Sequence, residues 1–173
     1  MKRVILLVLA LALLVAGALS AQTTTASDEG SDVLRFDTMT GVVAPFTGTA
    51  NPIRDVPGGG LPWEIDRASG RLRADGRLDI KVRGLVLARR APVPPALQGT
   101  NPVAQFRAIV SCLTPSADGT TVETVNRTTD AVPATMPGGD ARIRAMVDLP
   151  DPCIAPIVFV TSPTGAWFAA TGI

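Results

Sequence analysis

The sequence predicts an all-β protein, an antiparallel β-sandwich of the immunoglobulin-like or jelly-roll-like kind with one disulfide. Short apolar or alternating runs are separated by turn-forming residues, and the 173-residue chain holds 16 Gly and 15 Pro. No stretch of about 12 residues carries an unbroken helical apolar period. The two cysteines, Cys112 and Cys153, each lie at or just past the end of an alternating run, which is where a bridge between strands is expected.

The N-terminus is typical of a secretory signal peptide. Lys2 and Arg3 precede an apolar run over 4–19, and small residues follow it. We therefore expect a signal peptide over 1–21, a flexible lead-in over 22–32 and a single sandwich domain over 33–173. The predicted location is secreted, either extracellular or in the cell envelope, with membrane contact only through the signal peptide during export. An uncleaved signal anchor is the alternative.

Removing the predicted signal peptide changes the charge balance. The whole chain has 16 basic and 15 acidic residues, a net charge of +1, whereas 14 basic and 15 acidic residues remain after position 21. Neither balance attracts nucleic acid or an anionic membrane in bulk. We accordingly expect no nucleic-acid partner.

The clearest element is a β-hairpin. A three-residue turn ending at Gly76 pairs Leu72 with Leu78, so that apolar side chains share one face. The same register places Arg71 opposite Asp79, and it puts Gly76 at the left-handed position that such turns need. A two-residue turn would mix the two faces.

Beyond this hairpin the apolar parity changes, from Ile80 and Val82 to Leu85 and Leu87. Gly84 lies at the change. We predict either a bulge at this position or a following stretch that is buried on both faces.

Further strands complete the predicted sandwich. They are expected over 106–112, 142–149, 157–160 and 167–170, with weaker ones over 34–36, 40–43 and 122–125. In the second of these, Arg142 and Arg144 alternate outward. Because two cysteines in an oxidising compartment most simply pair, we predict a Cys112–Cys153 disulfide, with two free thiols as the alternative.

The composition excludes several chemistries. With no His, the chain has no imidazole base and no His-ligated metal, and two cysteines are too few for a four-cysteine cluster. We predict no catalytic residue, no metal site and no cofactor. The remaining acid–base candidates are Glu64 with Asp66, beside Trp63, and Asp148 with Asp151, which any chain with this many acids offers by chance.

The glycine run 58–60 is bounded by Pro57 and Pro62. It lacks the Lys and the helix signal of a phosphate-binding loop. We interpret it as a flexible surface loop that leads Trp63 into the core.

A basic cluster carries the functional hypothesis. Eight Lys and Arg fall between positions 66 and 90 against three Asp, a local charge of +5. The predicted ligand-binding residues are Arg71, Arg73, Arg77, Lys81 and Arg83. No Tyr or Phe lies among them, so the stacking platform of a single-strand nucleic-acid binder is missing. The plainer interpretation is a solvated sheet face with Arg71 and Asp79 as a cross-strand ion pair.

These features favour a secreted, non-enzymatic domain of binding or structural type. Its expected partner is an anionic extracellular polymer such as an anionic polysaccharide, held on the Arg-rich hairpin face. Two alternatives are a secreted hydrolase that uses a carboxylate pair and a subunit of an envelope complex that docks another secreted protein through an exposed Trp.

Overall fold

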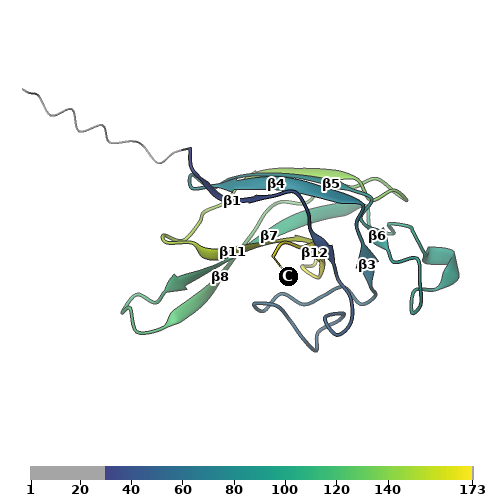
Figure 1. Ribbon diagram of the computed structural model, residues 1–173, viewed down its shortest axis with the longest axis horizontal. Coiled ribbons are helices and arrows are strands. Elements are labelled where there is room, and N and C mark those ends of the chain that lie inside the picture. The colour runs from purple at the N-terminus through teal and green to yellow at the C-terminus, as the bar shows by residue number, and fades with distance from the viewer. Residues whose placement is uncertain (1–29, 173) are drawn as a thin grey trace, which may run out of the picture.

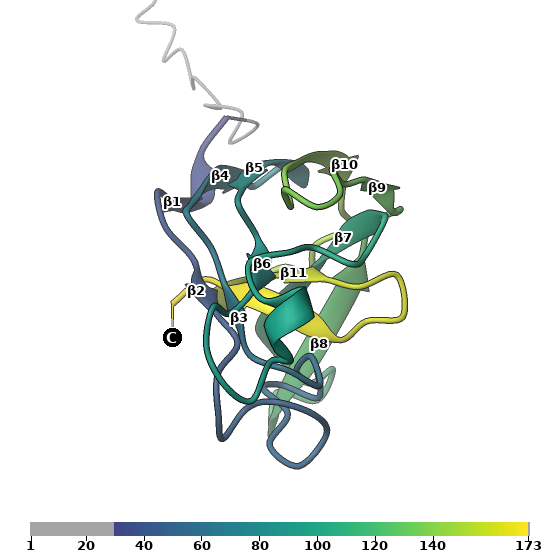
Figure 2. The same ribbon diagram turned by 90° about the vertical axis from the view of Figure 1, so that its right-hand side faces the viewer.

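The computed structural model describes residues 30–172, which form a sandwich of two antiparallel β-sheets. The four-stranded sheet lies over the six-stranded one, as both views show (Figures 1 and 2). The predicted fold class is therefore confirmed. The predicted signal peptide over 1–21 and most of the lead-in over 22–32 lie outside the described residues.

The four-stranded sheet has the order β1-β4-β5-β10, and the six-stranded sheet has the order β2-β12-β11-β7-β8, with β9 also paired to β7. The strands of the first sheet are β1 (Asp32–Phe36), β4 (Arg67–Arg73), β5 (Arg77–Arg83) and β10 (Ala141–Met146). Those of the second are β2 (Thr40–Gly41), β7 (Gln105–Pro115), β8 (Val122–Thr128), β9 (Val132–Pro133), β11 (Ile154–Thr161) and β12 (Trp167–Ala170). Strands β3 (Trp63–Glu64) and β6 (Val86–Leu87) pair with each other, and a short 3-10 helix, η1, spans Pro95–Leu97. No helix in residues 30–172 is long and apolar enough to cross a membrane.

The β4–β5 hairpin has the predicted register. Leu72 pairs with Leu78 and Arg71 with Asp79. Gly76 adopts a φ of 83°, the left-handed conformation that favours glycine. After this hairpin the apolar residues shift from even to odd positions, and the structure shows the predicted stretch that is buried on both faces. All four residues of 85–88 are buried.

The core lies between the two sheets. Leu72, Ile80 and Ile143 contribute fully buried side chains from the four-stranded sheet. Opposite them, the Trp63 ring stacks on Phe168 at a centroid distance of 3.9 Å. Phe106 meets both rings edge-on, and the β3–β6 pair that carries Trp63 closes one end of the sandwich (Figure 2).

The outer face of the six-stranded sheet is apolar around β11 and β12, and the segment 42–62 lies over this part of the sheet (Figure 1). Phe159 and Trp167 are in ring contact on this face, at 6.0 Å, and both are buried. The Trp167 amide donates a hydrogen bond to Pro57, and the Gly59 amide donates one to Trp167, each at 2.8 Å. Both tryptophans are thus core residues, and neither offers the exposed docking contact that the sequence suggested.

The glycine run corrects one expectation. Gly58 and Gly59 are buried, so the run is not a surface loop. A Cβ at Gly58 would collide with the Phe46 carbonyl, and one at Gly59 would press on the Phe168 and Trp63 rings. Glycine is needed here because backbone approaches backbone and aromatic rings closely.

The predicted disulfide joins Cys112 of β7 to Cys153, the residue before β11, with an S–S distance of 2.06 Å. Strands β7 and β11 are neighbours in the six-stranded sheet, and Cys112 is fully buried. The bridge therefore fastens two central strands whose cysteines are 41 positions apart in the chain.

Removing this bridge is expected to destabilise the fold. Closing a loop of this length in the unfolded chain contributes roughly 4 kcal/mol. The double variant Cys112→Ala/Cys153→Ala should therefore melt about 10 °C below the oxidised protein in a thermal scan followed by circular dichroism. The reduced native chain is the control and should melt near the variant. A melting temperature within about 2 °C of the oxidised protein would contradict the expectation.

Candidate functional site: a basic sheet face

The outward side of the four-stranded sheet is dominated by cations. Alternation along the strands turns the apolar side chains inward and leaves nine basic side chains on the other side. These nine residues, here called the basic face, are Arg35, Arg67, Arg71, Arg73, Arg77, Lys81, Arg83, Arg142 and Arg144. The same strands carry two acidic residues, Asp32 at one corner and Asp79 near the centre.

This grouping segregates the charge of the molecule. After position 21 the chain holds 14 basic and 15 acidic residues, so only five basic residues but 13 acidic ones lie outside these four strands. A chain that is close to neutral in total therefore presents one strongly positive surface. The electrostatic field of this surface extends roughly 10 Å before salt screens it.

The strand register sets like charges directly opposite each other. Arg67 pairs with Arg83 across β4 and β5. Lys81 pairs with Arg142 across β5 and β10, and Arg35 with Arg71 across β1 and β4. Like charges in such positions destabilise a sheet. The free protein therefore keeps these like charges next to each other in spite of the electrostatic repulsion between them.

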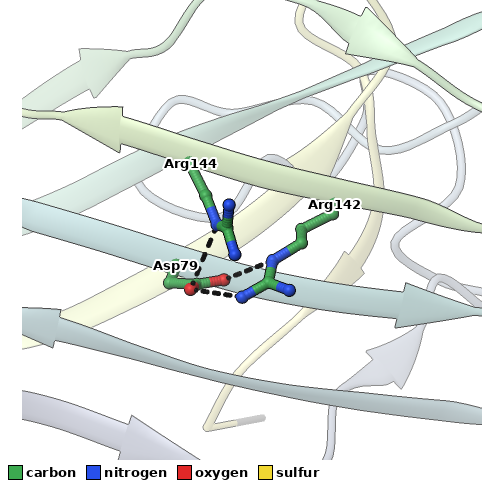
Figure 3. Close-up of polar contacts among 3 residues, drawn as sticks. All are labelled: Asp79, Arg142 and Arg144. Carbon is green, nitrogen blue, oxygen red and sulfur yellow. Dashed lines mark hydrogen bonds and ion pairs between the residues drawn. The ribbon is translucent and has the colours of Figure 1, made fainter.

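Asp79 is the acidic centre of this face (Figure 3). Arg142 donates two hydrogen bonds to its carboxylate, at 2.8 and 3.2 Å, and Arg144 lies at 3.5 Å. The hydrogen bonds from Arg142 lower the pKa of Asp79, with the charges of both arginines adding to the effect and partial burial opposing it. The predicted Arg71–Asp79 ion pair does not form, since the carboxylate turns to the arginines of the neighbouring strand β10.

Most of the remaining cations are uncompensated. Arg35 lies 3.9 Å from Asp32, and Arg77 lies 3.1 Å from Asp75 in the hairpin turn. Within residues 30–172, five members of the face make no ion pair and no side-chain hydrogen bond. These are Arg67, Arg71, Arg73, Lys81 and Arg83, and they include four of the five residues predicted from the sequence.

Three shallow depressions adjoin along the strands of this face. The largest, about 540 Å³, is lined by Arg71, Arg73, Arg77, Leu78, Asp79, Arg144, Ala145 and Met146. The next, about 220 Å³, shares Arg71 and Asp79 with the first and reaches Lys81. The third, about 170 Å³, shares Lys81 with the second and ends at Arg67 and Arg83. Together they form a furrow that runs the length of the hairpin.

The sequence interpretation missed part of this site and included residues that lie elsewhere. Arg142 and Arg144 belong to the face because β10 pairs with β5, a contact between segments about 60 positions apart. Arg89, which the local charge count included, instead donates a hydrogen bond of 2.6 Å to Glu64. The sequence showed that Arg142 and Arg144 alternate outward, but it did not show which strand lies beside β10.

The carboxylates considered as acid–base candidates have other surroundings. Glu64 is engaged by Arg89, and the Trp63 ring beside it is buried. Asp148 is almost fully exposed, with its carboxylate 4.0 Å from Arg127. In the described part of the chain no group of three or more potential metal ligands comes together.

No protein-family model matches the sequence, and no curated protein or solved structure matches it either.

The pKa of Asp79 leads to a pH-dependent prediction. Because the folded state lowers this pKa, the carboxylate stabilises the fold above its unfolded value near 3.9, and the contribution is lost as the pH falls through the folded value. Asp79→Asn should be less stable than the native protein at pH 7, by under about 1 kcal/mol because the pair is partly exposed. Urea unfolding at several pH values should show this difference vanish once the pH has fallen below the folded pKa of Asp79. Asp148→Asn is the control, and a pH-independent deficit in Asp79→Asn would contradict the assignment.

Proposed function

We propose that the protein is a secreted, non-enzymatic domain that binds an anionic extracellular polymer, such as an acidic or sulfated polysaccharide, along its basic face. One observation carries the proposal. The register opposes like charges in three cross-strand pairs, and five cations have no acidic partner in the described chain. A polyanion that lies on the face neutralises this repulsion, so its binding removes the destabilisation that the like charges cause in the free domain.

The geometry favours a polymer over a small anion. A strand of seven residues is roughly 20 Å long, and outward side chains recur every ~7 Å along it. The furrow is shallow and open along this length, whereas small-molecule sites are concave and enclose most of their ligand. A chain with repeating negative groups can contact successive rows of cations, from Arg67 at one end to Arg77 at the other.

The cation type favours oxyanion groups. Eight of the nine basic residues are Arg, whose planar guanidinium donates paired hydrogen bonds to carboxylate, sulfate or phosphate. The one aromatic residue of the four strands, Phe36, is buried, so no exposed ring is available on the face for stacking of nucleobases. The Cys112–Cys153 disulfide is consistent with an oxidising, extracellular compartment.

Removing charge from the face should weaken binding. Arg71 and Arg73 have no acidic partner in residues 30–172, so Arg71→Gln/Arg73→Gln removes two cations without breaking a contact of the fold. We expect the dissociation constant for heparin to rise at least about tenfold, since charge-assisted hydrogen bonds contribute roughly 1.5–3 kcal/mol each. Titration by fluorescence anisotropy at fixed ionic strength measures this change.

The matched control is Arg89→Gln/Arg90→Gln, which removes the same charge from outside the face. It should change the dissociation constant by less than about twofold. Equal losses in the two variants would show that only net charge matters, and failure of the native protein to bind any polyanion at low salt would overturn the proposal. A single-stranded oligonucleotide is expected to bind more weakly than heparin, and tighter binding would redirect the proposal to nucleic acid.

Removing the central acid should have the opposite effect. Asp79→Asn releases Arg142 and Arg144 and deletes the negative charge at the middle of the furrow. Heparin affinity at pH 7 should increase by about threefold or more, even though the variant is slightly less stable. Asp148→Asn carries the same charge change away from the face and should leave the affinity unchanged. An equal gain in both variants would argue against a specific role for the furrow.

A further inference from the structure

A second surface is the free edge of β8. This strand is the last of the six-stranded sheet and pairs with β7 on one side only. Figure 1 shows it at the border of the molecule, with no strand beside its other edge. Most of its residues are exposed, and the exposed fraction of Val122 is 65%. It has seven residues and contains neither Pro nor Lys, two residue types that commonly protect an edge strand from pairing with another chain.

The direction of the free backbone groups follows from the hydrogen bonds that flank the β7–β8 ladder. The Ser116 amide donates to the Thr121 carbonyl, and the Thr129 amide donates to the Ala108 carbonyl. In an antiparallel ladder the bonding direction alternates residue by residue. The odd-numbered residues from 121 to 129 therefore face β7, and the even-numbered residues of β8 point their amides and carbonyls to the open side.

The sequence of β8, Val-Glu-Thr-Val-Asn-Arg-Thr, is complementary to itself when reversed about Val125. In that antiparallel alignment Glu123 lies opposite Arg127 of a second copy, and Arg127 lies opposite Glu123. Thr124 then faces Asn126, and Val122 faces Thr128. We propose that β8 pairs with β8 of a second copy of this chain, around a twofold axis at Val125, to form a symmetric dimer.

The backbone directions agree with this register. The residues that point outward, such as Thr124 and Asn126, meet each other and form the hydrogen-bonded pairs. Glu123 and Arg127 then form non-hydrogen-bonded pairs, in which side chains approach most closely. A shift by one residue would oppose inward and outward groups and break the ladder, and a shift by two would separate the charges.

Both charged side chains are available for the contact. Arg127 uses its Nε to donate a hydrogen bond of 2.9 Å to the Asp148 carbonyl, which leaves its terminal nitrogens without a partner in the described chain. Glu123 is exposed and makes no ion pair within residues 30–172. Since both lie on the same side of the sheet, two equivalent ion pairs would flank Val125.

The dimer would orient the two basic faces alike. A twofold axis relating antiparallel neighbours in one sheet runs perpendicular to that sheet, so each copy keeps its four-stranded sheet on the same side. Two furrows then face one way. This consequence rests on the proposed function, and it would raise the avidity for a long polymer because the second contact becomes intramolecular.

Charge reversal tests the dimer without any polymer present. Sedimentation velocity of the purified protein, from about 1 to 300 µM, should show a concentration-dependent shift from monomer to dimer mass, as expected for a small edge interface. E123R and R127E each oppose like charges and should raise the dissociation constant of the dimer at least about tenfold. The double variant E123R/R127E restores opposite charges and should dimerise like the native protein.

A mixture of E123R and R127E gives the most discriminating test, because all charges that face each other across the mixed dimer are opposite in sign. The mixture should dimerise when neither variant does so alone. Thr124→Pro removes an outward amide while leaving the β7 ladder intact, and it should abolish the dimer. A thermal melt of each variant verifies folding. A native protein that stays monomeric at 300 µM, or single variants that dimerise normally, would overturn the dimer while leaving the polyanion proposal standing.

Discussion

The register of the β4–β5 hairpin is the constraint on which the rest of the site depends. Because side chains alternate across a strand, seating Leu72, Leu78 and Ile80 in the core leaves no freedom for the residues between them. Arg71, Asp79 and their neighbours must then point outward together. A slip of one residue would bury the cations and expose the apolar side chains. The burial of apolar side chains therefore fixes which residues lie on the outer face of the sheet.

The energies explain why the fold tolerates a repulsive face. Each large apolar side chain that becomes fully buried, such as Leu72, Ile80 or Ile143, contributes roughly 1.5–3 kcal/mol. Each opposed pair of like charges at an exposed sheet surface costs a fraction of this amount. Burial therefore decides the register, and the electrostatic cost remains on the surface. Asp79 lowers that cost near the centre of the face, because its carboxylate lies within ion-pair distance of both Arg142 and Arg144.

The six-stranded sheet plays a different part. Apolar residues lie on both of its faces, so one face packs against the four-stranded sheet and the other needs the cover of segment 42–62. Gly58 and Gly59 allow that cover to approach closely, and the Trp167 backbone bonds to it. This segment also reaches β8, where Asn126 donates a hydrogen bond of 2.8 Å to the Arg54 carbonyl, but no strand pairs with the outer edge of β8.

Local pattern alone determined the hairpin, its three-residue turn, the disulfide and four of the five uncompensated cations. Each depends on residues close in sequence, on alternation, or on two cysteines having only one partner each. Other features depended on tertiary packing. The pairing of β10 with β5 brought Arg142 and Arg144 to Asp79 and displaced the expected Arg71 contact, while Glu64 drew Arg89 into a contact outside the face. The burial of Gly58 and Gly59 likewise depended on a sheet formed by distant strands. Period-two alternation states which way a side chain points, but the choice of neighbouring strand is made by the burial of apolar surface across the whole chain.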